Sequence, residues 1–322
     1  MSSLDTQLNA ALIQALTGVK YDAVRARVTA MSARYRAEQV DDTTLGMADD
    51  LDCLAYAVFR MPATYRAIRT ALRAAATHVG AFDTHLDLGG GTGSAAWAAA
   101  DVWPAIRTEI VERQPAAIEL GRRLLTALAS SNQRWSHADL RRWTPDRRVD
   151  LVTIAYVLNE LSEATRHRLI STAAETTDTV AIVEPGTPRG FHRILEARRQ
   201  LIDHGLTIAA PCPHQHICPL TTNDWCHFAV RLPRTELHRL TKNGTRNYED
   251  EKFSYLVATR APVHPAEARV LSRPTRPKGQ VILDLCSSDG TRRGTAVAKS
   301  SGRYRAARAA AWGDAWPVCQ RS

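Results

Sequence analysis

The spacing of apolar side chains predicts a helical first quarter of the chain. Apolar residues recur at helical spacing in four segments, residues 4–16, 21–39, 44–58 and 63–79. Asp41 and Asp42 interrupt the pattern after the second segment, and Pro62 lies where a new helix could begin. We expect residues 1–78 to form a helical region that caps a larger domain.

From His85 the pattern changes to short apolar strands that alternate with helices. The predicted strands are His85–Leu88, Arg107–Val111, Asp150–Ala155 and Thr179–Glu184, with a further pair at His227–Leu232 and Phe253–Thr259. This alternation predicts an α/β fold, in which helices cover both faces of a parallel sheet. The domain is expected to span residues 79–262, with an insertion at about 206–230.

A third pattern begins after Arg260, where several prolines give the chain a linker-like composition. Two short apolar runs, Gln280–Cys286 and Gly294–Ala298, are separated by a turn and predict a small hairpin. A helix rich in Arg and Ala is expected from Tyr304 to Trp316. Residues 263–322 are therefore expected to form a C-terminal extension.

The positive charge of the chain is concentrated in this extension. The 322 residues include 42 Lys and Arg against 33 Asp and Glu, which gives a formal net charge of +9. Residues 269–322 alone hold eleven Lys or Arg and three Asp. Such a segment is typical of binding to a polyanion, above all RNA or DNA, although it could also serve only to keep the protein in solution.

Composition excludes several classes of protein. The 44% hydrophobic and 23% charged residues are typical of a globular chain and not of a disordered or fibrous one. No apolar run approaches the roughly 18 to 20 residues of a membrane span. Residues 1–8 carry Asp5 and no basic residue, unlike a secretory or mitochondrial targeting peptide. We therefore expect a cytoplasmic protein without a membrane partner, whose six cysteines stay reduced.

A glycine-rich loop is the most informative local motif. Asp87-Leu-Gly89-Gly-Gly91-Thr-Gly93 directly follows the first predicted strand and opens a helix rich in alanine. Glycines let the backbone come close to a ligand, and the N-terminus of a helix offers free N–H groups to a carboxylate or phosphate. The loop is therefore expected to bind a cofactor.

Two acidic residues after the next strands strengthen this expectation. Glu112 ends the second strand, 19 residues after Gly93, where its carboxylate can accept hydrogen bonds from both hydroxyls of a ribose. Asp139 follows the third strand region, where it can accept an adenine amino group. This order resembles the Rossmann-like methyltransferases that use S-adenosylmethionine, whose first motif is Asp-x-Gly-x-Gly-x-Gly. A tight turn without a ligand and a nicotinamide site remain as alternatives.

Four of the six cysteines form one pattern. Cys212, Cys218 and Cys226 lie within 15 residues, interrupted by prolines, and Cys286 follows 60 residues later. Four thiolates suit either a structural zinc ion or an iron–sulfur cluster, and their spacing does not choose between the two. Buried thiols without a metal are the third possibility. Nearby histidines could act as ligands or face solvent: His214, His216 and His227.

Longer segments carry a more specific resemblance. They are Glu184-Pro-Gly-Thr-Pro, Ala210-Pro-Cys-Pro-His, Asp224-Trp-Cys-His-Phe, Arg231-Leu-Pro-Arg and Tyr248-Glu-Asp-Glu-Lys-Phe. Together with the glycine loop and Tyr156-Val-Leu-Asn-Glu-Leu, they resemble the methyltransferase-like assembly factors of the mitochondrial small ribosomal subunit and their bacterial relatives. The resemblance runs from about residue 55 to Trp316.

This resemblance implies a Rossmann-like S-adenosylmethionine-dependent methyltransferase fold with an N-terminal helical region, a cysteine-rich insertion and a basic C-terminal extension. It implies that S-adenosylmethionine is bound by Asp87, Gly89, Gly91, Gly93, Glu112 and Asp139. It also implies a [4Fe–4S] cluster, in preference to zinc, on Cys212, Cys218, Cys226 and Cys286. That cluster would join the insertion to the extension, so its role would be structural rather than redox-catalytic.

The implied partners are the rRNA of the small ribosomal subunit and its assembly intermediates, and the chain is expected to be monomeric off the ribosome. The basic extension then becomes a candidate RNA-binding surface. The cations expected to contact phosphates are Arg273, Arg276, Lys278, Arg292, Arg293, Lys299, Arg303, Arg305 and Arg308.

Methyl transfer itself is less clearly indicated than cofactor binding. The Asn/Asp-Pro-Pro-aromatic motif of amino-methylating enzymes is missing after the fourth strand, where Asn159 and Glu160 could orient an amine or only cap the next helix. One function is therefore an rRNA methyltransferase, or a methyltransferase-like factor, in small-subunit assembly. Its rival is a non-catalytic assembly chaperone that binds S-adenosylmethionine and senses iron–sulfur supply. A small-molecule methyltransferase would leave the basic extension and the cysteines without a role.

Overall fold

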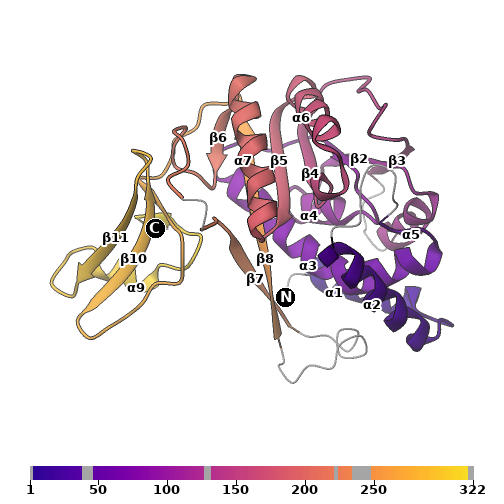
Figure 1. Cartoon of the computed structure of the whole chain (residues 1–322), viewed down its shortest axis with the longest axis horizontal. Coiled ribbons are helices and arrows are strands. Elements are labelled where there is room, and N and C mark those ends of the chain that lie inside the picture. Colours follow the sequence, from indigo (N-terminus) through magenta and orange to yellow (C-terminus); the bar gives the residue numbers. More distant parts are fainter. Residues whose placement is uncertain (1–2, 38–45, 127–131, 221–223, 234–247, 318–322) are drawn as a thin grey trace.

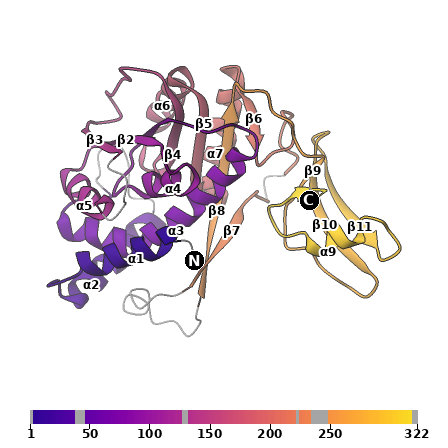
Figure 2. The ribbon, with the colours of Figure 1, turned by 180° about the vertical axis from the view of Figure 1, so that it is seen from behind.

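The computed structural model describes residues 3–37, 46–126, 132–220, 224–233 and 248–317. A central sheet is flanked by helices, and a smaller C-terminal module lies beside one edge of this sheet (Figures 1 and 2). The first three elements are helices, α1 (Ser3–Ala15), α2 (Tyr21–Ala37) and α3 (Asp50–Ala76).

The central sheet has eight strands, and the predicted Rossmann-like methyltransferase fold is confirmed by their arrangement. The strands are β1 (Thr84–Leu88), β2 (Arg107–Glu112), β3 (Gln133–His137), β4 (Val149–Ala155), β5 (Thr177–Pro185), β6 (Thr207–Ala210), β7 (Phe228–Pro233) and β8 (Tyr248–Thr259). Their order is β3-β2-β1-β4-β5-β8-β6, with β7 paired to the first half of β8. Strands β1 to β5 are parallel neighbours, whereas β8 is antiparallel to both β5 and β6. The carboxyl ends of β1, β2 and β4 therefore meet at one edge of the sheet.

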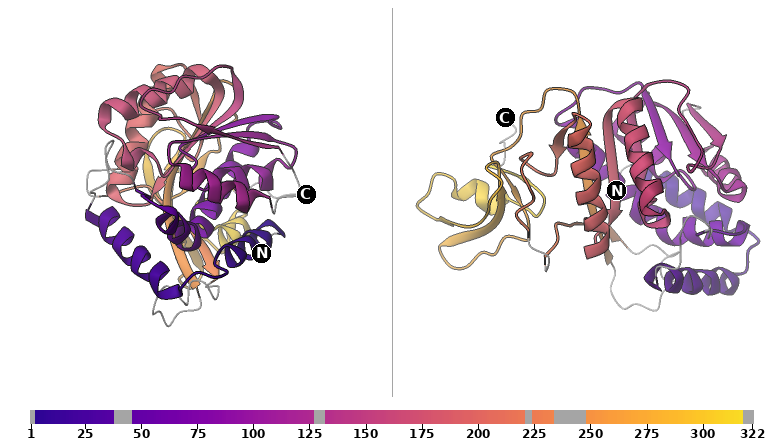
Figure 3. Two further views of the ribbon diagram at one scale, coloured as in Figure 1. Left: turned by 90° about the vertical axis from the view of Figure 1, so that its right-hand side faces the viewer. Right: turned by 45° about the horizontal axis from the view of Figure 1, so that its top comes forward.

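Helices cover both faces of the sheet, as Figure 3 shows. Beside α1 to α3, the flanking helices are α4 (Ser94–Val102), α5 (Pro115–Leu125), α6 (Glu163–Thr176), α7 (Pro188–Asp203) and the one-turn η1 (Leu158–Glu160). In β5, Ala181 and Val183 pack toward the N-terminal helices, while Val180 and Ile182 pack toward α6 and α7. This alternation explains why the strand is almost continuously apolar: both of its faces are buried. None of the helices in the described ranges is long and apolar enough to cross a membrane.

The expectation that a new helix begins near Pro62 is wrong, because α3 continues through Pro62 without interruption. A proline inside a helix removes one N–H donor, so that the helix loses one hydrogen bond. Here most side chains of α3 are buried, and this packing outweighs the local preference. Asp41, Asp42 and the first residues of the predicted 44–58 helix lie outside the described part of the chain.

The C-terminal module, residues 268–316, has a sheet and a hydrophobic core of its own. Its elements are β9 (Ala268–Val270), β10 (Gln280–Ser287), β11 (Arg292–Ala298), α9 (Tyr304–Ala309) and β12 (Ala315–Trp316), with strand order β11-β10-β9-β12. The predicted hairpin is confirmed by the antiparallel pairing of β10 with β11. Leu283, Leu285 and Val297 pack against Ala307 of α9 in this core.

The helix expected from Tyr304 to Trp316 is shorter than predicted. It ends at Ala309, and the chain turns through Gly313, which has a φ of +94°, so that Trp316 can pair with Ala268. The guanidinium group of Arg276 donates to the carbonyls of Arg308 and Ala310, which the end of the helix leaves without partners. The short strand after α9 thus closes the small sheet.

Candidate functional site

The glycine loop connects β1 to α4 at the carboxyl edge of the central sheet. Gly89, Gly91 and Gly93 all have positive φ angles, of 73°, 54° and 91°. A Cβ atom added to Gly90 would lie 2.4 Å from Asp87 Oδ2, and one added to Gly89 would lie 2.7 Å from a methyl carbon of Val157. Larger residues cannot be accommodated here without a shift of the loop. The loop therefore lies closely against the ends of β1 and β4.

Glu112 holds this loop in place from the end of β2. Its Oε2 accepts a hydrogen bond from the backbone N–H of Gly91 at 2.9 Å, and its Oε1 accepts from those of Arg113 and Gln114, both at 2.8 Å. Burial raises the pKa of Glu112, and these three donors oppose that rise. A carboxylate has about four acceptor positions, so Glu112 keeps capacity for a further donor from a ligand.

Asp87 is fully buried beneath the loop and has only one of its oxygens paired. Oδ1 accepts from the hydroxyl of Thr153 at 2.6 Å, whereas Oδ2 has no hydrogen-bond partner. Burial raises the pKa of Asp87 to about 7. Asp87 lines the glycine-loop pocket, where a donor from a ligand would satisfy the unpaired oxygen.

A chain of hydrogen bonds continues from Asp87 into the sheet. Since the Thr153 hydroxyl donates to Asp87, its oxygen accepts from His85 Nε2 at 2.8 Å, and His85 Nδ1 in turn accepts from the hydroxyl of Thr108 at 3.1 Å. Burial lowers the pKa of His85 to about 3, so its ring is neutral. These hydrogen bonds fix which nitrogen of His85 carries the proton, and they present the Thr153 hydroxyl as a donor to the ionised form of Asp87.

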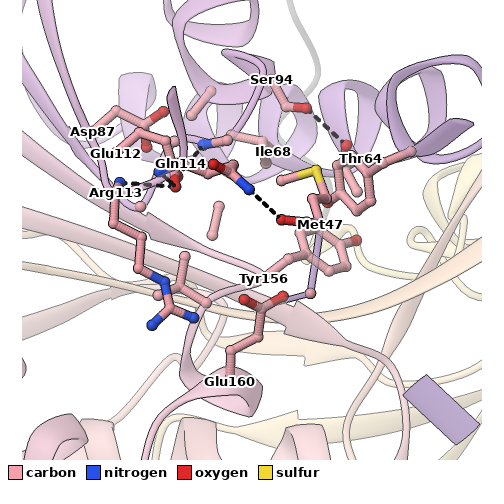
Figure 4. Close-up of a pocket in the computed structure, with 18 residues that line it drawn as sticks. Met47, Thr64, Ile68, Asp87, Ser94, Glu112, Arg113, Gln114, Tyr156 and Glu160 are labelled. Carbon is pink, nitrogen blue, oxygen red and sulfur yellow. Dashed lines mark hydrogen bonds between the residues drawn. The ribbon is translucent and has the colours of Figure 1, made fainter. Parts of the chain in front are cut away.

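The glycine-loop pocket is lined by residues of the loop, of α3 and of the segment that follows β4. Figure 4 shows Asp87 and Glu112 on one side of it, and Tyr156 and Glu160 on the other. The side-chain amide of Gln114 donates to the carbonyls of Met47 and Ala48, which brings the segment before α3 to the pocket. Its lining comprises Gly46, Met47, Tyr56, Thr64, Ile68, Asp87, Gly89, Gly90, Gly91, Ser94, Ala95, Glu112, Arg113, Gln114, Ala155, Tyr156, Val157 and Glu160.

A partly buried ion pair supports the far wall of this pocket. Arg60 of α3 binds both carboxylate oxygens of Glu251 in β8, at 2.7 and 3.1 Å, and the hydroxyl of Tyr156 donates to the same carboxylate at 3.4 Å. Tyr156 has a φ of +60°, which is strained for a residue with a side chain. The sequence analysis did not predict this pair. The signal available in the sequence was Arg60, a single charge within the apolar run of α3.

The predicted cofactor and catalytic residues do not all meet. Asp87, Gly89, Gly91, Glu112 and Glu160 line the pocket, and Gly93 begins α4 beside it. Asp139 is not part of the lining: Arg141 binds its carboxylate and lowers its pKa to about 2. Asn159 is also absent from the lining, and its buried amide oxygen has no partner. The capping alternative for Asn159 and Glu160 is wrong, because Ser162 caps α6.

The four predicted metal ligands surround one cavity between the two sheets. Cys212 and Cys218 lie in the loop after β6, Cys226 precedes β7, and Cys286 belongs to β10. The other walls of this cysteine cavity are mainly apolar side chains of α7, β8 and the cysteine-bearing loop. In the described part of the chain no three Cys, His, Asp or Glu side chains converge closely enough to hold a single metal ion.

Three of the four thiols in the cysteine cavity are neutral unless a metal displaces their protons. Burial raises the pKa of Cys218 and Cys226, and raises that of Cys286 to about 12. His214 lies in the same wall, with Nε2 3.2 Å from the sulfur of Cys286. The side chains of His216 and His227 are absent from the lining.

The basic residues of the C-terminal module fall into two groups. Five are engaged within the protein: Arg273 with Asp250, Arg276 with the carbonyls at the end of α9, Arg292 with Asp224 and Asp284, Arg293 with Asp289, and Arg303 with Glu267. Four are exposed, and the described part of the chain offers their side chains no ion pair or hydrogen bond: Lys278, Lys299, Arg305 and Arg308. Those four are the cations most available to a polyanion.

Comparison with known proteins gives one family and several relatives. The model of the family described as mitochondrial small ribosomal subunit Rsm22 matches residues 50–317. The human ribosome assembly protein METTL17, mitochondrial, is 30% identical over 292 residues, which cover 82% of this chain and 62% of that protein. The Rsm22-cox11 tandem protein 2, mitochondrial, of Schizosaccharomyces pombe is 26% identical, covering 94% of this chain and 47% of its own length. The chain thus spans about half to three-fifths of the length of these relatives.

Two solved methyltransferase structures resemble part of the chain. Magnesium protoporphyrin IX methyltransferase from Synechocystis PCC 6803, with bound SAH, is 16% identical at a TM-score of 0.40, covering 62% of this chain and 82% of its own. The N-methyltransferase NodS from Bradyrhizobium japonicum WM9 is 15% identical at a TM-score of 0.40, covering 61% and 94%.

The expected cytoplasmic location is wrong by these comparisons. The matched family and the curated relatives are all described as mitochondrial, which points to mitochondria rather than to the cytoplasm. The expectation rested on the lack of targeting features in residues 1–8, and an absence of this kind carries no information about location.

Proposed function

The chain belongs to the mitochondrial small ribosomal subunit Rsm22 family, and from this premise we propose that it is a methyltransferase-like factor in the assembly of the small ribosomal subunit. In this proposal the glycine-loop pocket binds S-adenosylmethionine, the cysteine cavity binds a [4Fe–4S] cluster, and the C-terminal module contacts rRNA. The observation that carries the proposal is the convergence of four cysteines, from positions up to 74 residues apart, on one cavity between the two sheets.

The residues of the glycine-loop pocket fit S-adenosylmethionine. The unpaired Oδ2 of Asp87 can accept from the amino group of the cofactor, and Glu112 can accept from a ribose hydroxyl. Gly93, at the start of α4, makes no side-chain cap, so the free N–H groups there can bind the carboxylate of the cofactor. When bound, S-adenosylmethionine would supply an electrophilic methyl group. The chain itself orients the cofactor and shields it with Met47 and Tyr156.

The cysteine cavity fits a cluster better than a single zinc ion. In a four-iron cluster each thiolate binds a different iron, so the sulfur atoms lie further apart than the four ligands of one zinc. The four cysteines line one cavity without converging on a single point, which is the wider arrangement. The apolar walls would exclude water from such a cluster and slow its loss.

The test of the cluster is the visible absorption and metal content of protein purified without oxygen. We expect a brown protein with a broad band near roughly 400 nm and about four irons per chain, and we expect Cys286→Ser to lose both. If wild-type protein holds one zinc ion per chain, the cavity binds a structural zinc ion and not a cluster. Wild-type protein without any metal would contradict this part of the proposal.

RNA binding is proposed for the four cations without partners, Lys278, Lys299, Arg305 and Arg308. Lys278 and Lys299 lie at the same end of the β10–β11 hairpin, where Lys299 donates its backbone N–H to the carbonyl of Gly279. Arg305 and Arg308 are three residues apart on α9 and therefore share a face. Each phosphate contact should contribute about 0.7 to 0.9 to the slope of log affinity against log salt.

The test is the salt dependence of binding to a small-subunit rRNA fragment. Replacing the four cations by Gln should lower the slope by about 2.8 to 3.6, as expected for four lost contacts. A control with Arg273, Arg293 and Arg303 replaced by Gln, which changes three paired cations, should lower the slope by less. Equal slopes for the wild type and the fourfold variant would contradict the assignment.

A specific observation favours an assembly factor that does not transfer the methyl group. Of the two candidates for orienting an acceptor, only Glu160 lines the pocket, while Asn159 does not. The discriminating experiment is incubation of S-adenosylmethionine-loaded protein with small-subunit assembly intermediates. Conversion of the cofactor to S-adenosylhomocysteine requires methyl transfer, and intact cofactor after many binding cycles favours the non-catalytic function.

A further inference from the structure

Two buried arginines line the cysteine cavity together with the four cysteines. Arg198 comes from α7, and Arg269 comes from β9 of the C-terminal module. Only 6% of Arg198 and 8% of Arg269 is exposed. Charged side chains are seldom buried to this extent unless a partner of opposite charge is buried with them.

In the described part of the chain, neither guanidinium group has a carboxylate partner. Arg198 Nη2 donates to the carbonyl of His214 at 2.9 Å, and its buried Nε has no acceptor. Arg269 donates from Nε to the carbonyl of Pro211 at 2.8 Å and from Nη1 to that of Gly313 at 3.0 Å. By contrast, Arg193 on the same helix as Arg198 pairs with the buried carboxylate of Glu184 at 2.7 Å.

Backbone carbonyls satisfy N–H donors but do not cancel a net charge. The cavity therefore holds two buried guanidinium groups beside the four cysteines. An uncompensated buried charge costs several kcal/mol even after the protein relaxes around it. A bound anion with about two negative charges, placed next to the cysteines, would offset this unfavourable free energy.

We propose that Arg198 and Arg269 are the counter-charges of a dianionic tetrathiolate metal centre in the cysteine cavity. The inference rests on the proposed function, since it requires a metal on the four cysteines. Four thiolates around a [4Fe–4S] core in its doubly positive state sum to two negative charges, and four thiolates around Zn²⁺ sum to the same. Either centre is matched by the two guanidinium groups.

The contacts of Arg269 give it a positioning role as well. Its side chain joins Pro211, directly before the first cysteine, to Gly313, near the end of the C-terminal module. The same side chain thus links the cysteine-bearing loop, the metal centre and the module that carries the cations proposed for RNA. Arg198 makes no such link, so it is the cleaner residue for testing charge alone.

The experiment compares Arg198→Met with Arg198→Lys, which keeps the charge, and with Arg260→Met, an exposed arginine away from the cavity, as a control. Arg260 donates only to backbone carbonyls, those of Ala174, Thr177 and His204, and it does not line the cavity. Each protein is purified without oxygen, and three properties are measured: metal per chain, the rate at which a chelator removes the metal, and thermal unfolding with and without metal. For iron-loaded protein, the reduction potential is measured by titration with dithionite.

We expect Arg198→Met to lose its metal to a chelator at least tenfold faster than the wild type, while its metal-free form unfolds at the same temperature or higher. This opposite response arises because the buried cation stabilises the loaded cavity and destabilises the empty one. The reduction potential should shift to more negative values, since a nearby cation favours the added electron. Arg198→Lys should restore most of the retention, and Arg260→Met should lower both stabilities alike.

Two outcomes would overturn the proposal, and they can be told apart. If wild-type protein binds neither iron nor zinc, the proposed metal site fails and the counter-charge role fails with it. If wild-type protein loads normally and Arg198→Met matches it in metal retention, in metal-free stability and, with iron, in potential, then only the counter-charge role is wrong. If Arg198→Met fails to fold, Arg198→Lys carries the test: metal retention at the wild-type rate supports the requirement for charge, and loss at least tenfold faster contradicts it.

Discussion

The glycine-loop pocket takes its polar groups from the ends of neighbouring strands in one parallel sheet, whereas the cysteine cavity takes its thiols from two sheets and the loop between them. In the pocket, Glu112 already accepts three backbone hydrogen bonds without any ligand. In the cavity, Arg198 and Arg269 are buried without counter-charge. Apart from Asp87, the polar groups that hold the pocket are thus paired within the protein itself, whereas the cavity depends on what it binds.

The difference shows which site is stable without a ligand and which site depends on one for its stability. A site whose groups hydrogen-bond to one another loses little stability when its ligand leaves. A site that gathers protonated thiols and unbalanced cations in an apolar cavity gains much from a ligand that binds only the folded state. Three experiments test this contrast, beginning with the largest expected effect.

The first removes the metal from the cysteine cavity. We expect a chelator, or Cys286→Ser, to destabilise the attachment of the C-terminal module by more than about 3 kcal/mol, because the metal bonds join it to the main domain. Limited proteolysis with a non-specific protease should then cut residues 261–267 at least tenfold faster. The control is Cys286→Ser treated with chelator, in which no further acceleration is expected. Equal cleavage rates with and without metal would show that the cysteine cavity does not depend on a metal for its stability, and the contrast with the glycine-loop pocket would be wrong.

The second tests Asp87, the exception among the satisfied groups of the pocket. The folded-state pKa of Asp87 is raised from 3.8 to about 7 by burial, so the folded protein binds a proton there that the unfolded chain has released. Stability from this group is present at low pH and is lost as the pH rises through about 7. Relative to Asp87→Asn, the wild type should lose on the order of 2–4 kcal/mol of unfolding free energy between about pH 5 and pH 8.

Denaturant unfolding at several pH values measures this difference. Asp150 provides the control, because hydrogen bonds from Asp83 and Thr84 lower its pKa instead. Its stabilisation is present above the usual aspartate pKa and lost only in acid, so the difference between wild type and Asp150→Asn should stay flat from about pH 5 to pH 8. A flat difference for Asp87→Asn as well would show that the group stays ionised.

The third weakens the cofactor contact and leaves the rest of the fold intact. Glu112→Gln should reduce affinity for S-adenosylmethionine by roughly 10- to 100-fold, the cost of one or two charge-assisted hydrogen bonds. Calorimetric titration measures this loss. Glu109→Gln on the same strand is the control, because Glu109 pairs with Arg134 and Arg147 away from the pocket and should leave affinity unchanged. Equal losses in both variants would contradict the assigned role of Glu112.

Much of the fold was predictable because its signals are local. Strands such as β4 and β5 are recognisable from their own apolar runs, and the β10–β11 hairpin from two runs with a turn between them. The placement of Asp87 and Glu112 in one pocket also followed from the sequence, since the ends of neighbouring parallel strands meet at one edge. Pro62 and the short α9 were mispredicted because packing decided against the local preference.

Most of the elements, the glycine loop and the group of Cys212, Cys218 and Cys226 were predictable from the sequence, because each depends on residues close together in the chain. The tertiary structure alone decided that Asp139 pairs with Arg141, that Arg60 meets Glu251 across 191 positions, and that five of the nine basic candidates are engaged within the protein. It also decided that Arg198 and Arg269 lie without counter-charge beside the cysteines. The physical reason is that charge balance depends on distance and burial in space, which the order of residues does not specify.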